Sequence, residues 1–255
     1  MFFSSKNRSL RKLKKYAKKY NCDKRFLGYL DKYNDHFYKQ RLNNKNILEI
    51  GVKRKTKESP GASSLKMWKK YFPNSIINGI DIDPINKSYE ENRIRIFTGD
   101  QGDESFLNTV IKKTGNFDIV IDDGSHINEL TIRSYNYLFQ KLNPGGLYII
   151  EDLLCSYMNL DEHNIVEKSI KSEKSEDGEY GTWWGMHLIK DTSFKNNRSD
   201  IDNFIKSKVY DLDLWKDKIS ESKRGRIEKL YLDRKMDKIE QIIFYKWMIL
   251  IKKAI

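Results

Sequence analysis

The sequence predicts an α/β fold built on a mostly parallel β-sheet, and three observations support this prediction. Short apolar segments alternate with amphipathic helical segments between residues 46 and 152. Almost every one of these apolar segments ends in an acidic residue or a glycine. The chain has 255 residues, 38% of them hydrophobic, which is enough for one large domain with a core. Apolar strands that alternate with helices are typical of parallel sheets covered on both faces.

Five strands and three helices are expected in the alternating region. The strands are predicted at residues 46–52, 75–84, 93–100, 117–123 and 147–152. The helices are predicted at residues 62–72, 103–115 and 127–142, and the NPGG segment at 143–146 is predicted to be a turn. Ser63 or Ser64 is the expected N-cap of the first helix and Gly115 the expected end of the second, because hydroxyls favour helix starts and glycines helix ends.

The beginning of the chain is predicted to be helical and basic. The first twenty residues carry eight Lys or Arg and no acid. Apolar residues recur there at helical spacing: Leu10, Leu13, Tyr16, Ala17 and Tyr20. A basic helix that lies on an anionic membrane or glycan is one interpretation. A helix that docks on the protein with a solvated basic face is the favoured one, and residues 23–42 are expected to form a further helix.

The end of the chain is predicted to differ from the alternating region. Residues 156–235 are polar and charged, which favours a mobile insertion or lid followed by helices. Residues 238–253 are expected to form two antiparallel strands with a tight connection around Tyr245 and Lys246. The expected organisation is a basic helical segment at 1–44 and one domain at 45–255 that contains the insertion.

The net charge of +12 raises the question of a nucleic-acid partner. The lysines are spread over the whole chain and no RNA-binding or helix-turn-helix signature is present, so a solvated basic surface is favoured. Cys22 and Cys155 lie far apart without metal-ligand spacing, which indicates a reducing cytoplasm. No apolar run approaches the roughly 20 residues that span a bilayer, and the first residues lack the apolar region of a secretory signal.

The carboxyl ends of the strands are where a parallel α/β sheet binds its ligands. Gly51 would let the backbone approach a ligand, Asp81 could accept both hydroxyls of a ribose, and Asp100 could accept an adenine amino proton. Each residue alone is explained equally well by a turn, but their order in one βαβ series favours a nucleoside. Because neither phosphate-binding glycine motif is present, the nucleoside carries no phosphate that needs a cradle. S-adenosylmethionine fits that description.

Several segments resemble the class I methyltransferases. They are LEIGV, GASSLKMWKKYFPNSIINGIDIDP, GDQGD and FDIVIDDGSHINELTIRSYNYLFQKLNPGGLYIIEDL, and they cover roughly residues 20–160 together with the final strand pair. More narrowly, IDDGSH followed by IED is similar to the metal-dependent sugar O-methyltransferases of macrolide biosynthesis, the mycinamicin sugar methyltransferase type, and to the cephalosporin hydroxylase family. The resemblance implies a three-layer Rossmann-like fold with a mostly parallel seven-stranded sheet and an antiparallel C-terminal strand.

The resemblance also implies which residues bind the cofactor. The residues expected to bind S-adenosylmethionine are Glu49, Gly51, Ser63, Asp81, Asp100, Gln101 and Asp122. Asp122 is expected at the methionine end. The family has more glycine after EIGV than this chain, which has KRKTKESPG, so Lys or Ser would meet the carboxylate of the cofactor there.

Three carboxylates are expected to converge at one rim of the sheet. Asp123 ends the fourth strand and Glu151 and Asp152 end the fifth, its expected neighbour at about 4.8 Å. Like charges resist joint ionisation, and a hard divalent cation with oxygen ligands, Mg²⁺, relieves this. In the family the corresponding residues are the metal ligands. The alternative is that Asp123 and Asp152 only cap the segments that follow them.

His126 is the catalytic base that the resemblance implies, with Asp123 beside it. We expect His126 in the first turn of a helix whose N-cap is Ser125, where the helix dipole disfavours a charged imidazole. A neutral imidazole can accept a proton. The alternative is a histidine that only hydrogen-bonds the turn. His187, next to Trp183 and Trp184, is a candidate for an acceptor pocket or for ordinary packing.

The predicted function is Mg²⁺-assisted transfer of a methyl group from S-adenosylmethionine to a sugar hydroxyl. A surface polysaccharide or its nucleotide-sugar precursor is favoured as the acceptor, with a natural-product sugar as the other setting. A methyltransferase of RNA, protein or a small catechol-like molecule and a non-catalytic protein of the same fold are the rivals. A hydroxylase is disfavoured because no two-histidine, one-carboxylate arrangement is present. A homo-oligomer is expected.

Overall fold

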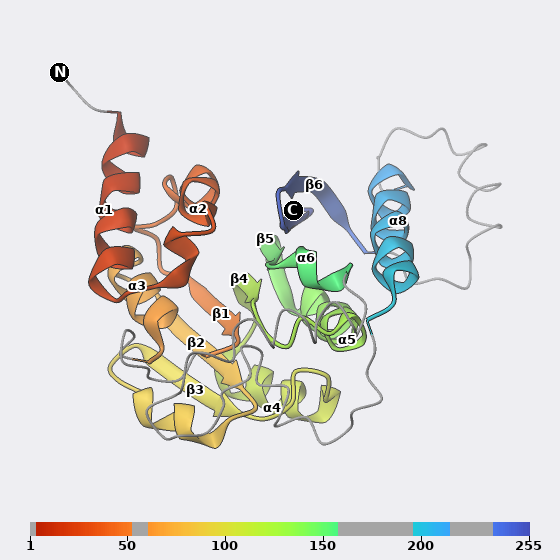
Figure 1. The fold of residues 1–255 in the computed structure, drawn as a ribbon, viewed down its shortest axis with the longest axis horizontal. Helices are drawn as coiled ribbons and strands as arrows, with labels where there is room; N and C mark the ends of the chain where they lie inside the picture. Colours follow the sequence, from red (N-terminus) through yellow and green to blue (C-terminus); the bar gives the residue numbers. More distant parts are fainter. Residues whose placement is uncertain (1–3, 53–60, 158–195, 215–236) are drawn as a thin grey trace, which may run out of the picture.

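The computed structural model describes residues 4–52, 61–157, 196–214 and 237–255, which form a seven-stranded sheet with helices on both faces (Figure 1). The strands are β1 (Asn46–Ile50), β2 (Ile76–Asp81), β3 (Ile94–Thr98), β4 (Phe117–Asp122), β5 (Leu142–Ile150), β6 (Ile239–Tyr245) and β7 (Met248–Lys253). Their order in the sheet is β3-β2-β1-β4-β5-β7-β6. The first five run parallel, whereas β7 is antiparallel to β5 and β6 is antiparallel to β7. The predicted fold class is confirmed.

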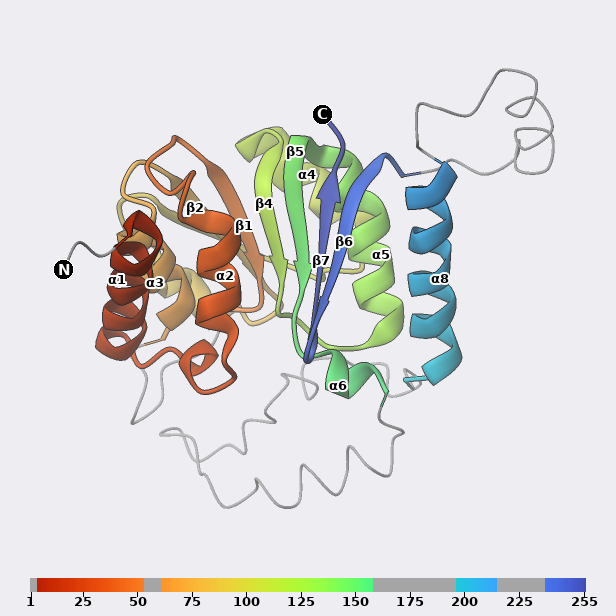
Figure 2. The same cartoon turned by 90° about the horizontal axis from the view of Figure 1, so that it is seen from above.

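Two groups of helices lie on opposite faces of the sheet and complete three layers (Figure 2). One face is covered by α1 (Ser5–Lys19), α2 (Tyr29–Phe37) and α3 (Ser63–Tyr71). The other face is covered by α4 (Glu104–Thr114), α5 (Asn128–Leu138) and α8 (Arg198–Leu214). The short elements are η1 (Asp23–Arg25), η2 (Pro84–Tyr89), η3 (Phe139–Lys141) and α6 (Leu153–Ser156).

The strands are apolar on both sides because each side meets a helical layer. In β4, Ile119 and Ile121 join the core under α1 to α3, whereas Val120 joins the core under α4, α5 and α8. Successive side chains of a strand point to opposite faces, so this alternation fixes which face each strand-end residue points to. The same alternation decides the positions of the acidic residues that follow β1, β4 and β5.

The N-terminal helix packs against the protein with its basic face in solvent. Leu13 and Ala17 are fully buried, and the hydroxyls of Ser9 and Tyr71 lie 2.8 Å apart, which joins α1 to α3. All eight Lys and Arg side chains of this segment are exposed. The favoured interpretation of a docking helix with a solvated basic face agrees with this arrangement.

The single helix predicted at residues 23–42 is wrong. The chain forms η1, then turns at Gly28, which has a left-handed φ of 73°, and then forms α2. Glycine adopts this conformation at little steric cost, so it allows a sharp change of direction between two short helices. As a result, η1 and α2 both face the carboxyl end of the sheet.

Two further local predictions are corrected. The N-cap of α3 is Ala62, in a left-handed conformation with a φ of 48°, and neither Ser63 nor Ser64 caps it. The NPGG segment belongs to β5, where the pairing register with β4 shifts between Phe117 and Ile119. Turn-forming residues inside a strand are typical of a bulge. The composition of NPGG favoured a turn, but pairing with β4 makes this segment part of the strand.

The C-terminal strand pair agrees with the prediction, since Tyr245 pairs with Met248 across a tight connection. Gly115 closes α4 as expected. Most of the insertion expected at 156–235 lies outside the described residues, as do His187 and residues 53–60 of the KRKTKESPG loop, and the division at residue 44 stays a prediction. Within the ranges that the structure describes, no helix has the length and apolar character needed to cross a membrane.

His36 is expected to make the stability of the fold sensitive to acid. Its Nε2 atom lies 2.9 Å from the Tyr245 hydroxyl, which ties α2 to the strand pair. Burial lowers the pKa of His36 below its usual value of 6.5, with Asp35 opposing. Because the folded state then binds the proton less well than the unfolded state, this contribution to stability is complete above the unfolded pKa and is lost as the pH falls from there through the lower folded pKa.

We therefore predict that His36→Gln reduces the fall in unfolding free energy between about pH 7 and about pH 5, measured by urea denaturation. Tyr245→Phe is the matched control, because it removes the hydroxyl partner but keeps the titrating imidazole. An equal pH dependence in His36→Gln and the native protein would contradict the prediction.

Candidate active site at the carboxyl end of the sheet

Four acidic residues lie close together at the carboxyl ends of β1, β4 and β5: Glu49, Asp123, Glu151 and Asp152. The three strands are neighbours, and Ile50, Asp122 and Ile150 lie in one register row. Asp123 and Glu151 follow directly after that row. Parallel strands end at the same edge of a sheet, so the residues that follow them converge there.

Asp122 and Asp123 point to opposite faces of the sheet. Asp122 is 2% exposed and accepts hydrogen bonds from the Ser134 hydroxyl at 2.8 Å, the Tyr148 hydroxyl at 3.1 Å and the Gln101 amide at 3.3 Å. Burial raises its pKa, and these hydrogen bonds counteract the rise. In this structure the Asp122 carboxylate is hydrogen-bonded within the core under α5. Its expected contact with the methionine end of the cofactor stays a prediction.

Gln101 connects this buried network to the loop after β4. Its side-chain oxygen accepts a hydrogen bond from the Ser125 backbone at 2.8 Å, and its amide donates to Asp122 and to Ser134. The Gln101 side chain thereby fixes the Gly124–Ser125 backbone. A role in cofactor binding, expected from the sequence, stays a prediction beside this structural one.

Lys24 lies between the acidic residues on the other face. Its ammonium nitrogen is 2.5 Å from Asp123 Oδ2, 2.8 Å from Glu151 Oε1 and 3.1 Å from Glu49 Oε1. Lys24 is 1% exposed, and Glu49 and Glu151 are equally buried. Burial opposes the charge of Lys24, but the three carboxylates outweigh it and raise its pKa well above the usual value. Burial raises the pKa of Glu49 to about 7 against the effect of Lys24.

Two tyrosines of α2 donate hydrogen bonds to the two acidic residues that follow β5. The Tyr29 hydroxyl donates to Asp152 Oδ1 at 2.5 Å, and the Tyr33 hydroxyl donates to Glu151 Oε1. Burial raises the pKa of both phenols, and so does the charge of the carboxylate that each one contacts. The N-terminal helices therefore supply donors to the carboxyl edge of the sheet in addition to covering its core.

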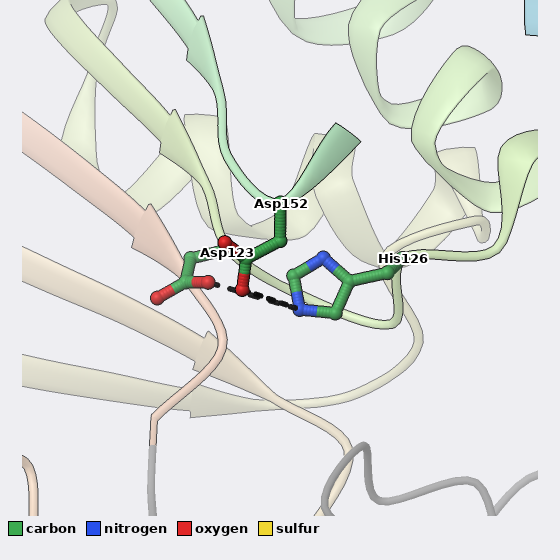
Figure 3. A group of neighbouring side chains, drawn as sticks. All are labelled: Asp123, His126 and Asp152. Atoms are coloured by element: carbon green, nitrogen blue, oxygen red, sulfur yellow. Dashed lines mark ion pairs between the residues drawn. The ribbon is translucent and has the colours of Figure 1, made fainter. Parts of the chain in front are cut away.

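His126 faces the carboxylate oxygens that the N-terminal helices leave open (Figure 3). Its Nε2 atom is 3.8 Å from Asp123 Oδ1 and 3.9 Å from Asp152 Oδ2. These three side chains each offer one ligand atom, and the atoms lie within 4.8 Å of one another. The arrangement combines two carboxylate oxygens with one imidazole nitrogen at a partly exposed position.

His126 lies before the helix, contrary to the prediction that placed it in the first turn. The N-cap of α5 is Ile127, and Ser125 accepts a hydrogen bond from the Ile127 backbone at 3.3 Å in a local turn. His126 and Asp152 have left-handed φ angles of 54° and 52°. Such a conformation costs about 1–3 kcal/mol for a residue with a side chain and is concentrated at functional sites.

The residues present fit a divalent cation. Four carboxylates, those of Glu49, Asp123, Glu151 and Asp152, gather at this edge, and Lys24 contacts three of them. Carboxylate oxygens are the donors that Mg²⁺ prefers, and a cation lowers the cost of keeping neighbouring carboxylates ionised. The three predicted ligands do not form a single group in this structure: Asp123 and Asp152 lie together with His126, whereas Glu151 lies with Asp123 and Glu49.

The residues expected to bind the nucleoside lie along the ends of β1 and β2. Gly51 has a φ of 93°, and a Cβ atom there would lie 1.9 Å from the carbonyl oxygen of Asp123. Asp81 accepts hydrogen bonds from the backbone of Val52 at 2.6 Å and of Asp83 at 2.8 Å, which orders the segment after β1. Asp100 is exposed and accepts from the Gly102 backbone at 2.7 Å.

Two further residues expected to bind the cofactor are buried. Ser63 is buried in the first turn of α3, and Glu49 is buried beside Lys24. Lys24, Tyr29 and Tyr33 were not predicted as site residues. A lysine or a tyrosine in an N-terminal helix gives no sequence signal for a role at a strand end. That Lys24 lies beside three of the predicted acidic residues becomes visible only in the tertiary structure.

Comparisons with known proteins agree with the fold. No family model matches the chain. It is 46% identical over 126 residues to the mycinamicin VI 2''-O-methyltransferase of Micromonospora griseorubida, an alignment of 49% of this chain and 31% of that protein. It is 40% identical over 129 residues to the 8-demethyl-8-alpha-L-rhamnosyl tetracenomycin-C 2'-O-methyltransferase of Streptomyces olivaceus, covering 51% of this chain and 34% of that protein.

Solved structures show the same likeness over more of the chain. The MycE methyltransferase of the mycinamycin pathway, in complex with Mg and SAH, aligns with a TM-score of 0.67 and 28% identity, covering 95% of this chain and 54% of that one. Its complex with Mg, SAH and mycinamycin VI aligns with a TM-score of 0.66 and 30% identity, covering 95% of this chain and 53% of that one. The chain spans about a third of the length of the curated relatives and about half of the solved chains.

The sheet order and its two helical layers are those of the class I methyltransferase fold. More particularly, the comparisons confirm the resemblance drawn from the sequence, because this chain is similar to the sugar O-methyltransferases of macrolide biosynthesis.

Gly51 provides a test of how closely the backbone is packed at this edge. We predict that Gly51→Ala lowers the unfolding free energy by more than about 2 kcal/mol, because its Cβ atom would overlap the Asp123 carbonyl in addition to the unfavourable φ. Gly28→Ala is the matched control: its φ of 73° and ψ of 16° are left-handed and nothing lies within 4 Å of the added atom, so only the backbone cost of roughly 1–2 kcal/mol applies. Equal losses in chemical denaturation would show that the close approach is unimportant.

Proposed function

We propose that this protein transfers the methyl group of S-adenosylmethionine to a sugar hydroxyl with the assistance of Mg²⁺. The observation that carries the proposal is the open group of Asp123, Asp152 and His126 at the strand ends, beside the edge formed by Gly51 and Asp81. An imidazole facing two carboxylate oxygens combines a proton acceptor with a cation site. Alternative capping roles for Asp123 and Asp152 are disfavoured, because their carboxylates meet Lys24, Tyr29 and His126.

The chain's own residues would divide the work of the reaction. Asp81 and Gly51 would hold the adenosine of the cofactor, with Glu49, Ser63, Asp100, Gln101 and Asp122 as the remaining proposed contacts. Asp123 and Asp152, with Glu151 from the family resemblance, would hold Mg²⁺. A bound Mg²⁺ supplies positive charge that lowers the pKa of an acceptor hydroxyl. His126 would accept the hydroxyl proton at Nε2, and positioning would supply most of the rate.

The acceptor we propose is a sugar on a small molecule. The relatives are named for methylation of a mycinamicin or of a rhamnosyl tetracenomycin, and a MycE structure contains mycinamycin VI. Their names favour the natural-product setting over the surface polysaccharide that the sequence had favoured. Transfer to RNA or to a catechol-like molecule and a non-catalytic role remain rivals, and assembly into a homo-oligomer stays a prediction.

Cofactor binding is the first test. We predict that S-adenosylhomocysteine binds with a micromolar Kd in calorimetry and that Asp81→Ala weakens it roughly tenfold or more, the value of one or two hydrogen bonds to the ribose. Asp103→Ala is the matched control, because Asp103 is also a carboxylate that accepts backbone hydrogen bonds, but it caps α4. No binding to the native protein would remove the methyltransferase proposal.

Proton transfer is the second test. We predict that His126→Asn lowers kcat for methylation of a sugar glycoside by about 10²–10⁴-fold and leaves the Kd of S-adenosylhomocysteine unchanged. His36→Gln serves as the control histidine, and chelation of divalent cations should abolish transfer by the native enzyme. Full activity of His126→Asn would mean that the imidazole is not the base. Salt-sensitive binding of RNA in place of glycoside methylation would favour the RNA alternative.

A further inference from the structure

Asn196 connects the loop that carries His126 to the short helix that follows β5. Its side-chain nitrogen donates to the His126 carbonyl and to the Cys155 carbonyl, each at 2.9 Å. Its side-chain oxygen accepts a hydrogen bond from the Asn128 backbone at 2.8 Å. Because His126 precedes α5 and Cys155 lies in α6, one carboxamide joins two elements of the candidate site, from a position 70 residues after His126 in the sequence.

Both of these elements begin with an unfavourable backbone conformation. His126 has a φ of 54°, and Asp152, the N-cap of α6, has a φ of 52°. Residues with side chains keep such conformations only where the surrounding fold holds them. Asn196 reaches both, directly at the His126 carbonyl and one turn away from Asp152, whose carbonyl accepts from the Cys155 backbone at 2.9 Å. These bonds help to set how the imidazole faces the Asp152 carboxylate (Figure 3).

A second asparagine fixes the backbone around Asn196. The side chain of Asn128 is buried, and its amide donates to the carbonyls of Ser156 and Asn197, each at 3.0 Å. This segment is therefore attached to the start of α5 and to the end of α6 by bonds that do not involve the Asn196 side chain. A substitution of Asn196 consequently removes its own hydrogen bonds and leaves these attachments in place.

A purely structural role for Asn196 would concern the start of α5. The first N–H groups of a helix lack partners within the helix, and a side-chain oxygen usually accepts from one of them. Ile127, the N-cap of α5, has no such oxygen, and Asn196 Oδ1 accepts from the first residue of the helix instead. Capping explains the oxygen of the carboxamide, but it does not explain the two bonds that the nitrogen donates to the site.

We infer that Asn196 is a positioning residue for the reaction, because its side-chain nitrogen holds the His126 backbone in the conformation that turns the imidazole toward Asp152. This inference rests on the proposed function, in which His126 accepts the proton. The oxygen of the same carboxamide caps α5. The two roles belong to different atoms of one side chain, so a substitution can separate them.

Asn196→Asp is the decisive variant, because it keeps the oxygen that caps α5 and replaces the donating nitrogen with an oxygen that the two carbonyls repel. A carboxylate is favourable at a helix N-terminus, so α5 should stay intact. Misplacement of a reacting group by about 1 Å can cost 10²-fold in rate. We expect kcat for methylation of a sugar glycoside, at saturating Mg²⁺, to fall by about 10²-fold in Asn196→Asp and in Asn196→Ala.

The Kd of S-adenosylhomocysteine should stay unchanged in both variants, because other bonds, those of Asp81 to the backbone of Val52 and Asp83, order the cofactor edge. Asn197→Ala is the matched control. The Asn197 side chain accepts from the Ser199 backbone at 3.1 Å at the start of α8, so its loss should lower the melting temperature and leave kcat at the native value.

Nuclear magnetic resonance tests the backbone of His126 without an activity assay. A residue with positive φ gives a strong nuclear Overhauser effect between its own amide and Hα protons. The chain has four histidines, so protein labelled with ¹⁵N-histidine gives four amide signals, and His126→Asn identifies that of His126 by its loss. The effect should be strong in the native protein and in Asn197→Ala, and weak in Asn196→Asp.

Native kcat in Asn196→Asp would overturn the inference and leave Asn196 with capping alone. An unchanged Overhauser effect in Asn196→Asp, or an equal loss of kcat in Asn197→Ala, would overturn it as well. If Asn196→Ala does not fold, Asn196→Asp decides alone, and failure of Asn196→Asp to fold counts against the inference. If the native protein transfers no methyl group, the proposed function fails, and the Overhauser effect then decides separately whether Asn196 holds His126.

Discussion

The ion contacts of Lys24 are the interaction on which the carboxyl edge of the sheet depends. Glu49, Asp123 and Glu151 end or follow three neighbouring strands and point to the same face, where an apolar core lies behind them. Charges in such a place are costly to bury unless a cation pairs with them. Lys24 reaches them from η1, a segment 99 residues away from Asp123 in the sequence. The N-terminal helices supply the hydrogen-bond donors and the strand ends supply the carboxylates that accept them, so each part satisfies the buried polar groups of the other.

The pleat of β4 gives two consecutive aspartates different environments. Asp122 points into the core under α5, where a serine, a tyrosine and a glutamine satisfy it. Asp123 points to the face of Lys24 and His126, where one of its oxygens is left open. The same alternation that makes a strand apolar on both sides thus places one carboxylate in a structural role and the next in a chemical one.

The backbone of the loops contributes as much to the site as the side chains do. Gly51 allows β1 to pass close to the carbonyl of Asp123, and left-handed conformations at His126 and Asp152 turn both side chains toward each other. Asn196 holds the strained loop by donating to the His126 carbonyl at 2.9 Å. The cost of these conformations is offset by the contacts of the surrounding fold, so the geometry is set before any ligand arrives.

The sequence by itself determined the fold class, the positions of the five parallel strands and the closing strand pair, because hydrophobic periodicity and strand-end residues are local signals. It also identified Asp123, His126, Glu151 and Asp152 as neighbours, since strands of one parallel sheet end at one edge. It misplaced His126 in a helix and read NPGG as a turn, because loop conformation and strand pairing depend on distant partners. Only the tertiary structure decided that Lys24, Tyr29 and Tyr33 complete the site, because contacts between segments a hundred residues apart leave no periodic pattern in a single sequence.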